Sequence, residues 1–96
     1  MRIDAIMIKR EDNVATALRD LHREEDAAVS AGEAREMIRL IEDIPFGHKF
    51  AVCPINQGDQ IIKYGEVIGR ATQSIDQGAH AHIQNIESLR GRGDLD

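Results

Sequence analysis

Two of the four histidines stand close together in the stretch GAHAHIQN, residues 78–85. If this stretch is a β-strand, its side chains alternate between two faces, so His80 and His82 project from the same face roughly 6.5–7 Å apart at Cα. Two imidazoles so placed can share a ligand, and His48, which follows a glycine at the start of another expected strand, is a third candidate. Three neutral imidazoles around one divalent metal, with one position vacant, would form a catalytic metal site.

The spacing alone leaves three interpretations of His80 and His82 open. They are an exposed pair that needs no ligand, a pair of metal ligands, or a pair that contacts a substrate or a partner protein. The fourth histidine, His22, lies in the acidic segment HREED at 22–26 and is expected at the surface. Cys53 is expected to be a small buried hydrophobe on the strand face opposite His48.

A second group of candidates lies in IIKYGEVIG, residues 61–69, which predicts a β-hairpin with YGE at its tip. Gly65 and Gly69 would allow a positive φ or a close backbone approach there. Lys63 and Arg70 could hold a carboxylate through charge-assisted hydrogen bonds. The alternative is that Lys63 is solvated and Tyr64 covers the edge of the small core.

The elements that must position these side chains are mostly short strands. The segments 2–10 and 13–21 both alternate and predict a first hairpin, and 27–34 predicts a strand that runs into a glycine turn. From Pro45 onward, turn residues recur every 7 to 12 residues, which predicts a compact all-β domain. No internal repeat is evident.

One stretch, EAREMIRLIEDI at 33–44, fits two patterns. Ala34, Met37, Ile38 and Ile41 fit a helical stripe, and residue propensities favour helix. Residues 37, 39 and 41 also fit one face of a strand.

Composition excludes several classes of protein. A chain of 96 residues builds one domain with one modest core, and with three aromatic residues that core must be aliphatic. A net charge of −5 and so few aromatic side chains argue against nucleic-acid binding.

The charge is uneven, about −4 in residues 1–44 and −1 in 45–96, so a small anion would approach the second half more easily. One cysteine, no long apolar run and no secretory signal pattern predict a cytoplasmic protein that does not bind a membrane.

The run from Gly47 to Asn85 resembles the N-terminal SAF domain of the altronate and galactarate dehydratase family, and DNVATAL at 12–18 resembles the family's early strand. The resemblance covers about residues 12–89. Its combination of spaced glycines, an IKYG turn and HxHxxN is specific. The matching elements are Gly47-His48-Lys49, Gly58, Ile62-Lys63-Tyr64-Gly65, Ile68-Gly69, Ala71, Ile75, Gly78 and His80-x-His82-x-x-Asn85.

The resemblance implies a β-clip fold, the pseudo-barrel of short strands also found in antifreeze-like domains. Residues 1–89 would form this single domain and 90–96 a flexible tail. It also implies that 36–44 is mainly strand, since tertiary context can overrule helix propensity.

The resemblance further implies the small subunit of a two-chain altronate-type dehydratase, inactive alone and completed by a large catalytic subunit. Its substrate would be a small anionic hydroxy acid, and a divalent metal, expected to be iron, would be held mainly by the large subunit. His48, His80 and His82 would be catalytic, with His80 and His82 also candidate metal ligands, and the substrate would contact Lys63, Tyr64, Arg70 and Asn85. The alternatives are the alpha subunit of a sulfolactate sulfo-lyase and a non-catalytic module that binds sugar acids or supports assembly. Association of several copies of the chain also stays open.

Overall fold

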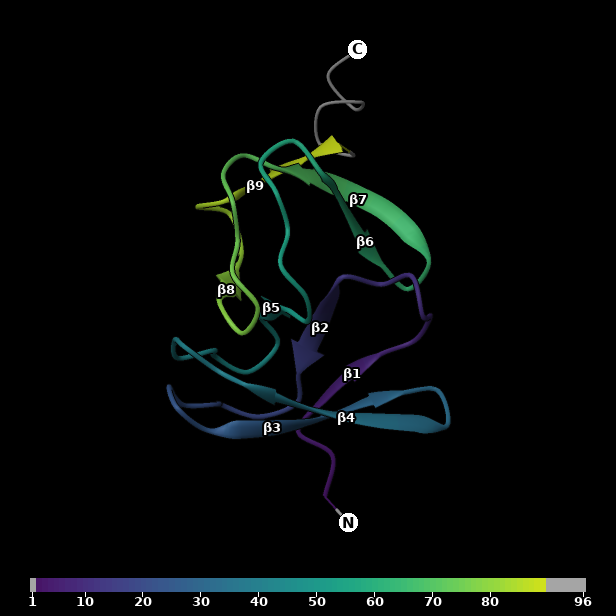
Figure 1. Ribbon diagram of the computed structural model, residues 1–96, viewed down its shortest axis with the longest axis vertical. Coiled ribbons are helices and arrows are strands. Elements are labelled where there is room, and N and C mark those ends of the chain that lie inside the picture. The colour runs from purple at the N-terminus through teal and green to yellow at the C-terminus, as the bar shows by residue number, and fades with distance from the viewer. Residues whose placement is uncertain (1, 90–96) are drawn as a thin grey trace.

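The computed structural model describes residues 2–89, which contain nine β-strands arranged in two open sheets (Figure 1). The expected all-β fold is thus confirmed, although neither sheet closes into a barrel. The predicted tail at 90–96 lies outside the described residues. The strands are β1 Ala5–Met7, β2 Val14–Ala17, β3 Asp26–Ala31, β4 Ala34–Arg39, β5 Lys49–Ala51, β6 Gln60–Lys63, β7 Glu66–Ala71, β8 His80–Ala81 and β9 Ile86–Ser88.

The larger sheet has the order β4-β3-β1-β2-β5-β8, and the smaller has the order β6-β7-β9. In Figure 1 the smaller sheet lies at the end of the molecule opposite β3 and β4. β1 and β2 form the predicted antiparallel hairpin, while β1 also pairs with β3 in parallel. The core is aliphatic apart from Phe50 and forms two clusters. One consists of residues between 5 and 50, and the other consists of Val14 and residues between 51 and 81.

The ambiguous stretch is a strand up to Arg39, as the family resemblance implied, and continues as a loop. The alternation of exposure explains the outcome: Met37 is 62% exposed, whereas its neighbour Ile38 is 3% exposed. A helical stripe would bury both side chains. Pairing with β3 along the whole length of β4 satisfies the backbone in the extended conformation, and this pairing outweighs the helix propensity.

One nine-residue loop occurs four times, at 18–26, 41–49, 52–60 and 72–80. The backbone therefore repeats this loop although the sequence shows no internal repeat. Each copy has a buried aliphatic residue followed three positions later by a residue with positive φ. The sequence hides the repeat because only these two positions are shared. The aliphatic residues are Leu21, Ile44, Ile55 and Ile75, and the positive-φ residues are Glu24, Gly47, Gly58 and Gly78.

The four loops close on one another in two pairs. Leu21 and Ile44 exchange two main-chain hydrogen bonds of 2.8 and 2.9 Å, and Ile55 and Ile75 exchange two of 2.8 Å. We call these the paired loops. The N–H of Ile41 in the second loop donates to the carbonyl of Gly78 in the fourth loop at 3.1 Å. This hydrogen bond connects the first pair of loops to the second pair.

Cys53 is exposed, so the expectation of a buried hydrophobe was wrong. The strand that was expected to bury it, β5, ends at Ala51. Cys53 instead belongs to the third of the four loops, in which only Ile55 is buried. A period of two no longer predicts burial once the strand has ended.

Candidate functional site

The strand pairing brings His48, His80 and His82 together. β5 and β8 pair antiparallel, with Lys49 opposite Ala81 and Phe50 opposite His80. Continued by one residue, the same register places His48 opposite His82, and His80 lies on the same face. One nitrogen from each ring lies within 4.8 Å of the others, and all three residues are half-buried. We call this group the imidazole cluster.

The three rings pack face to face. The ring centroid of His48 lies 4.1 Å from that of His82 and 5.2 Å from that of His80, with interplanar angles of 20° and 16°. Nδ1 of His48 and Nε2 of His80 are 2.9 Å apart, which is a hydrogen-bond distance. The three rings therefore form one compact stack.

Neighbouring polar side chains hold the cluster in place. Asn85 is buried and clamps the strand, because its Oδ1 accepts from the N–H of His82 at 2.9 Å and its Nδ2 donates to the carbonyl of His80 at 2.9 Å. Glu42 accepts the N–H of His80 at 2.8 Å, and Nε2 of Gln84 lies 3.0 Å from Nδ1 of the same ring. Both polar ends of Asn85 are occupied, so the geometry supports a positioning role; its predicted contact with a substrate stays a prediction.

Burial and neighbouring charges disfavour the charged forms of His80 and His82. Burial, followed by the charge of His48, lowers the pKa of His80, and the same two effects together with Lys49 lower the pKa of His82. Nδ1 of His82 is buried and has no hydrogen-bond partner among residues 2–89. A buried ring nitrogen left unpaired costs about 1–3 kcal/mol, so this atom is a natural contact point for a ligand.

A hollow of about 200 Å³ opens beside the cluster, with Lys49 on its wall. Burial, followed by the charge of Lys63, lowers the pKa of Lys49. Sequence reasoning missed Lys49, although its position directly after His48 in a strand that pairs with the HxH segment was a usable signal. The residues around the hollow are Lys49, Ile68, His82, Ile83, Ile86 and Ser88.

The remaining predicted substrate contacts do not line this hollow. The side-chain ammonium of Lys63 lies 4.9 Å from the ring centroid of Tyr64, which is 41% exposed and therefore covers little of the core. Arg70 forms an ion pair of 2.8 Å with Glu87 across β7 and β9. The charge of Lys63 lowers the pKa of Lys49, so Lys63 interacts electrostatically with a residue that lines the hollow.

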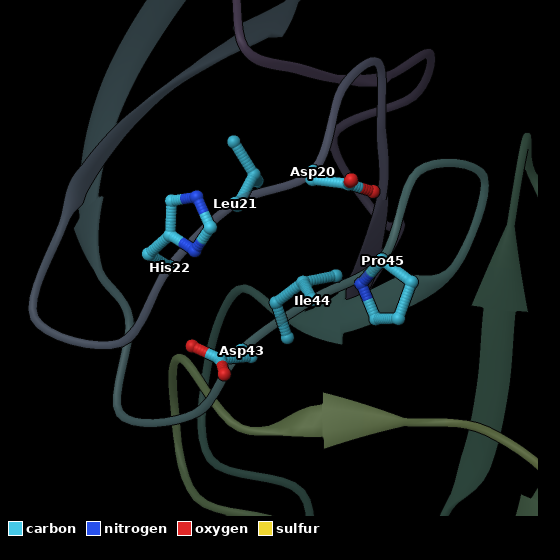
Figure 2. Close-up of a pocket in the computed structure, with 6 residues that line it drawn as sticks. All are labelled: Asp20, Leu21, His22, Asp43, Ile44 and Pro45. Atoms are coloured by element: carbon cyan, nitrogen blue, oxygen red, sulfur yellow. The ribbon is translucent and has the colours of Figure 1, made fainter.

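His22 is exposed, as predicted, and lies in a different hollow of about 210 Å³ (Figure 2). Figure 2 shows it on the same hollow as Asp20 and Asp43, whose carboxylates accept main-chain hydrogen bonds from Phe46 and Arg23. These two hydrogen bonds join the first loop to the second. His22 has no place in the imidazole cluster.

The donor set of the cluster fits a divalent transition metal. Three imidazole nitrogens without a carboxylate suit zinc, iron, nickel or copper better than magnesium or calcium. A fourth position left to solvent or substrate would make the site catalytic in type.

An all-β chain with paired loops and this HxHxxN segment has the features of a small β-clip SAF domain. The profile of the family described as altronate/galactarate dehydratase SAF domain matches residues 3–89, and the chain belongs to that family. Altronate dehydratase of Bacillus subtilis (strain 168) is 39% identical over 83 residues, which are 86% of this chain and 16% of the relative. Galactarate dehydratase (L-threo-forming) of Escherichia coli (strain K12) is 38% identical over 74 residues, 77% of this chain and 13% of the relative.

A third relative is (2R)-sulfolactate sulfo-lyase subunit alpha of Chromohalobacter salexigens, 45% identical over 47 residues. Those residues are 49% of this chain and 50% of the relative. The chain thus spans less than a fifth of the dehydratases and about half of the sulfo-lyase subunit. Among residues 2–89, the structure holds no helix that could span a membrane.

Proposed function

We propose that this chain is the small subunit of a two-chain, altronate-type sugar-acid dehydratase, and that its imidazole cluster faces the reaction centre of a separate large subunit. The lyase would remove water from a hydroxy acid to give a 2-keto-3-deoxy acid. The observation that carries the proposal is the convergence of three half-buried imidazoles in a chain whose relatives are dehydratases and a lyase subunit.

The reaction explains why such a face is useful. Breaking the C–H bond α to a carboxylate leaves an enediolate dianion, which needs cationic groups and little water to form. The C–O bond at the β carbon then breaks, the hydroxyl leaves as water after it gains a proton, and the enol product converts to the keto acid. The divalent metal implied by the family, expected to be iron held mainly by the large subunit, would stabilise the dianion as a Lewis acid.

In this scheme the side chains of the chain have distinct tasks. His80 or His82, neutral because burial lowers the pKa of each, can accept a proton within hydrogen-bond reach. The 2.9 Å contact between His48 and His80 lets a proton pass from one ring to the next. Lys49, on the wall of the adjacent hollow, offers a cation for the substrate carboxylate.

The alpha subunit of a sulfolactate sulfo-lyase is a second candidate, and one specific observation favours it. Over the 47 matched residues the identity with that subunit is 45%, against 39% and 38% with the two dehydratases. The chemistry would be the same proton abstraction with sulfite rather than water as the leaving group. The cluster geometry serves either reaction.

A non-catalytic module is the third candidate. The chain would then bind a sugar acid or support assembly without touching the reacting atoms. Titration of a hexonate into the chain separates this class from simple docking, since a binding module would take up the acid without its partner.

The deciding experiment assembles the chain with its large subunit and measures formation of the keto acid. We expect His80→Ala and His82→Ala each to lower kcat at least about 100-fold, the range that a positioned acid or base contributes. The control is His22→Ala, which changes an exposed histidine outside the cluster and should leave kcat unchanged. Unchanged kinetics in both cluster variants would rule out a catalytic role for the imidazoles.

A further inference from the structure

We infer that this chain by itself binds one divalent transition-metal ion between His48, His80 and His82, without the large subunit. The inference goes beyond the proposed function, which requires only that the imidazoles reach a substrate and places the family's metal mainly in the large subunit. It rests on the side chains of the cluster and on the contacts that hold them.

The separations between the nitrogens already approach those of a metal site. With zinc-to-nitrogen bonds of about 2.0–2.1 Å in a tetrahedral site, ligand nitrogens lie about 3.3 Å apart. Nδ1 of His48 and Nε2 of His80 are 2.9 Å apart, and one nitrogen of each ring in the cluster lies within 4.8 Å of the others. Movements of the rings by an ångström or so would bring all three around one ion.

The ring planes must turn for this to happen. They lie within 26° of one another, so three lone pairs are not yet aimed at one point. Rotation about χ2 of histidine is soft, because this torsion joins an sp³ to an sp² carbon. His82 can turn most easily, since its buried Nδ1 has no hydrogen bond within the described part of the chain that would be lost.

Gln84 supplies the outer contact that metal-binding histidines usually have. Its amide nitrogen lies 3.0 Å from Nδ1 of His80, so it donates to Nδ1 and leaves the ring proton on Nε2, toward His48. If Nε2 binds a metal, that proton moves to Nδ1, and a half-turn of the Gln84 amide lets its oxygen accept it. The same residue can therefore support both the empty and the loaded ring.

The backbone around the cluster is already fixed. Asn85 ties the main chain of His80 to that of His82, and Glu42 holds the N–H of His80. β5 and β8 hold His48 against the pair through their register. A site whose ligands are positioned before binding loses little conformational entropy when the ion enters.

The test uses the full chain with Co²⁺ and Zn²⁺ alone. We expect one Co²⁺ per chain, with visible d–d absorption of a low-symmetry site, and its displacement by Zn²⁺. His48→Ala, His80→Ala and His82→Ala should each weaken binding at least about 100-fold, because even outer contacts contribute 10–100-fold. Gln84→Leu should weaken it about tenfold, whereas His22→Ala should not change it.

A second measurement needs no variant. In the wild-type chain, Zn²⁺ should shift the imidazole NMR signals of three histidines and leave that of His22 in place. Absence of one-to-one binding, or equal binding by wild type and His80→Ala, would overturn the inference. If the wild-type chain binds no metal but the cluster variants lose lyase activity, the proposed function stands and this inference is wrong. If the wild-type chain binds one metal ion but the cluster variants keep full lyase activity, this inference stands and the catalytic role of the imidazoles is wrong.

Discussion

At the scale of single residues, two buried carboxylates, Asp12 and Asp4, hold separate segments of the main chain together. Asp12 is 4% exposed, and its oxygens accept the main-chain N–H groups of Ile8, Lys9 and Gly65 at 2.7–3.1 Å. It thereby ties the first hairpin to the turn at Tyr64 and Gly65, where both φ angles are positive, at 56° and 78°. Asp4 likewise accepts from the N–H of Ala28 and pairs with Arg19.

These carboxylates predict a loss of stability in acid. Burial raises the pKa of Asp12, but its backbone hydrogen bonds outweigh burial and hold the pKa below its usual range. A depressed folded-state pKa stabilises the fold above the unfolded value of about 3.9, and this stability is lost as pH falls through the folded value. Urea unfolding at pH 7 and pH 3 should show the loss.

The variant Asp12→Asn should lower the free energy of unfolding at pH 7 by about 1.5–3 kcal/mol, the usual size of a charge-assisted hydrogen bond. It should also flatten the dependence on pH between 5 and 3. A variant with the slope of the wild type would show that Asp12 does not carry the acid sensitivity.

The residue types pointed to His48, His80 and His82, because the side chains of an HxH strand project from the same face. Lys49 and Glu42 were not found, since their proximity depends on the register of β5 with β8 and on a loop from the other half of the chain. Gln84 was not found because the turn at 83–85 brings it back to His80, four residues earlier. The contact of Lys63 and Arg70 with a substrate stays a prediction.

At the scale of elements, the glycines of the paired loops differ in how much space surrounds them. A Cβ at Gly58 would meet nothing within 4 Å, whereas a Cβ at Gly78 would lie 2.2 Å from the carbonyl oxygen of Arg39. Both have positive φ, of 91° and 86°. Gly78 therefore lacks a side chain for two reasons, its backbone conformation and the approach of a neighbouring strand end.

This contrast gives a matched pair of variants. Gly58→Ala should lower the free energy of unfolding by about 1–2 kcal/mol, the cost of a left-handed residue with a Cβ. Gly78→Ala should cost a further 1–3 kcal/mol or so, because the added methyl overpacks the contact. Thermal and urea unfolding of both proteins measure the difference, and equal losses would contradict the reported approach of Arg39.

The first loop offers the opposite change. Glu24 is the positive-φ residue of the first loop, with φ of 72°, whereas the other three loops have glycine at the equivalent position. Glu24→Gly should therefore raise the free energy of unfolding by a few tenths to about 1 kcal/mol, the left-handed penalty less the entropy that glycine adds to the unfolded chain. A lower midpoint in urea would count against this account of the loop.

The strands themselves were largely predictable, because turn residues and alternation mark short strands well. The parallel pairing of β1 with β3 and the reciprocal closure of the loops were not, since neither leaves a pattern in neighbouring residues. β4 was predictable only through the family resemblance. Its own sequence favours a helix, and pairing with β3 decides otherwise.

At the scale of the whole molecule, the imidazole cluster has an exposed apolar neighbour. Ile83 follows His82 directly and is 84% exposed, and Phe46, two residues before His48, is 67% exposed. Large apolar side chains next to a candidate site are typical of a surface that another protein covers. If the proposed function holds, this is the side on which the large subunit docks.

Ile83→Glu tests that orientation. The unfolding free energy should change by less than about 0.5 kcal/mol, as for most exposed positions. Co-purification with the large subunit should fall sharply, because a charge would be buried without a partner. Val67→Glu is the matched control, since Val67 is 39% exposed and lies in the smaller sheet near the β6–β7 turn. Equal retention of the partner by both variants would place the docking face elsewhere.

The paired loops also set how the polypeptide acquires its shape. Each pair joins segments about twenty residues apart, and no helix among residues 2–89 offers an early local nucleus. Chains dominated by such distant pairings fold in milliseconds to seconds rather than microseconds. Refolding should therefore be slow for a chain so short. The imidazole rings of His48 and His80, which are 32 residues apart in the sequence, should be among the last groups to reach their native neighbours.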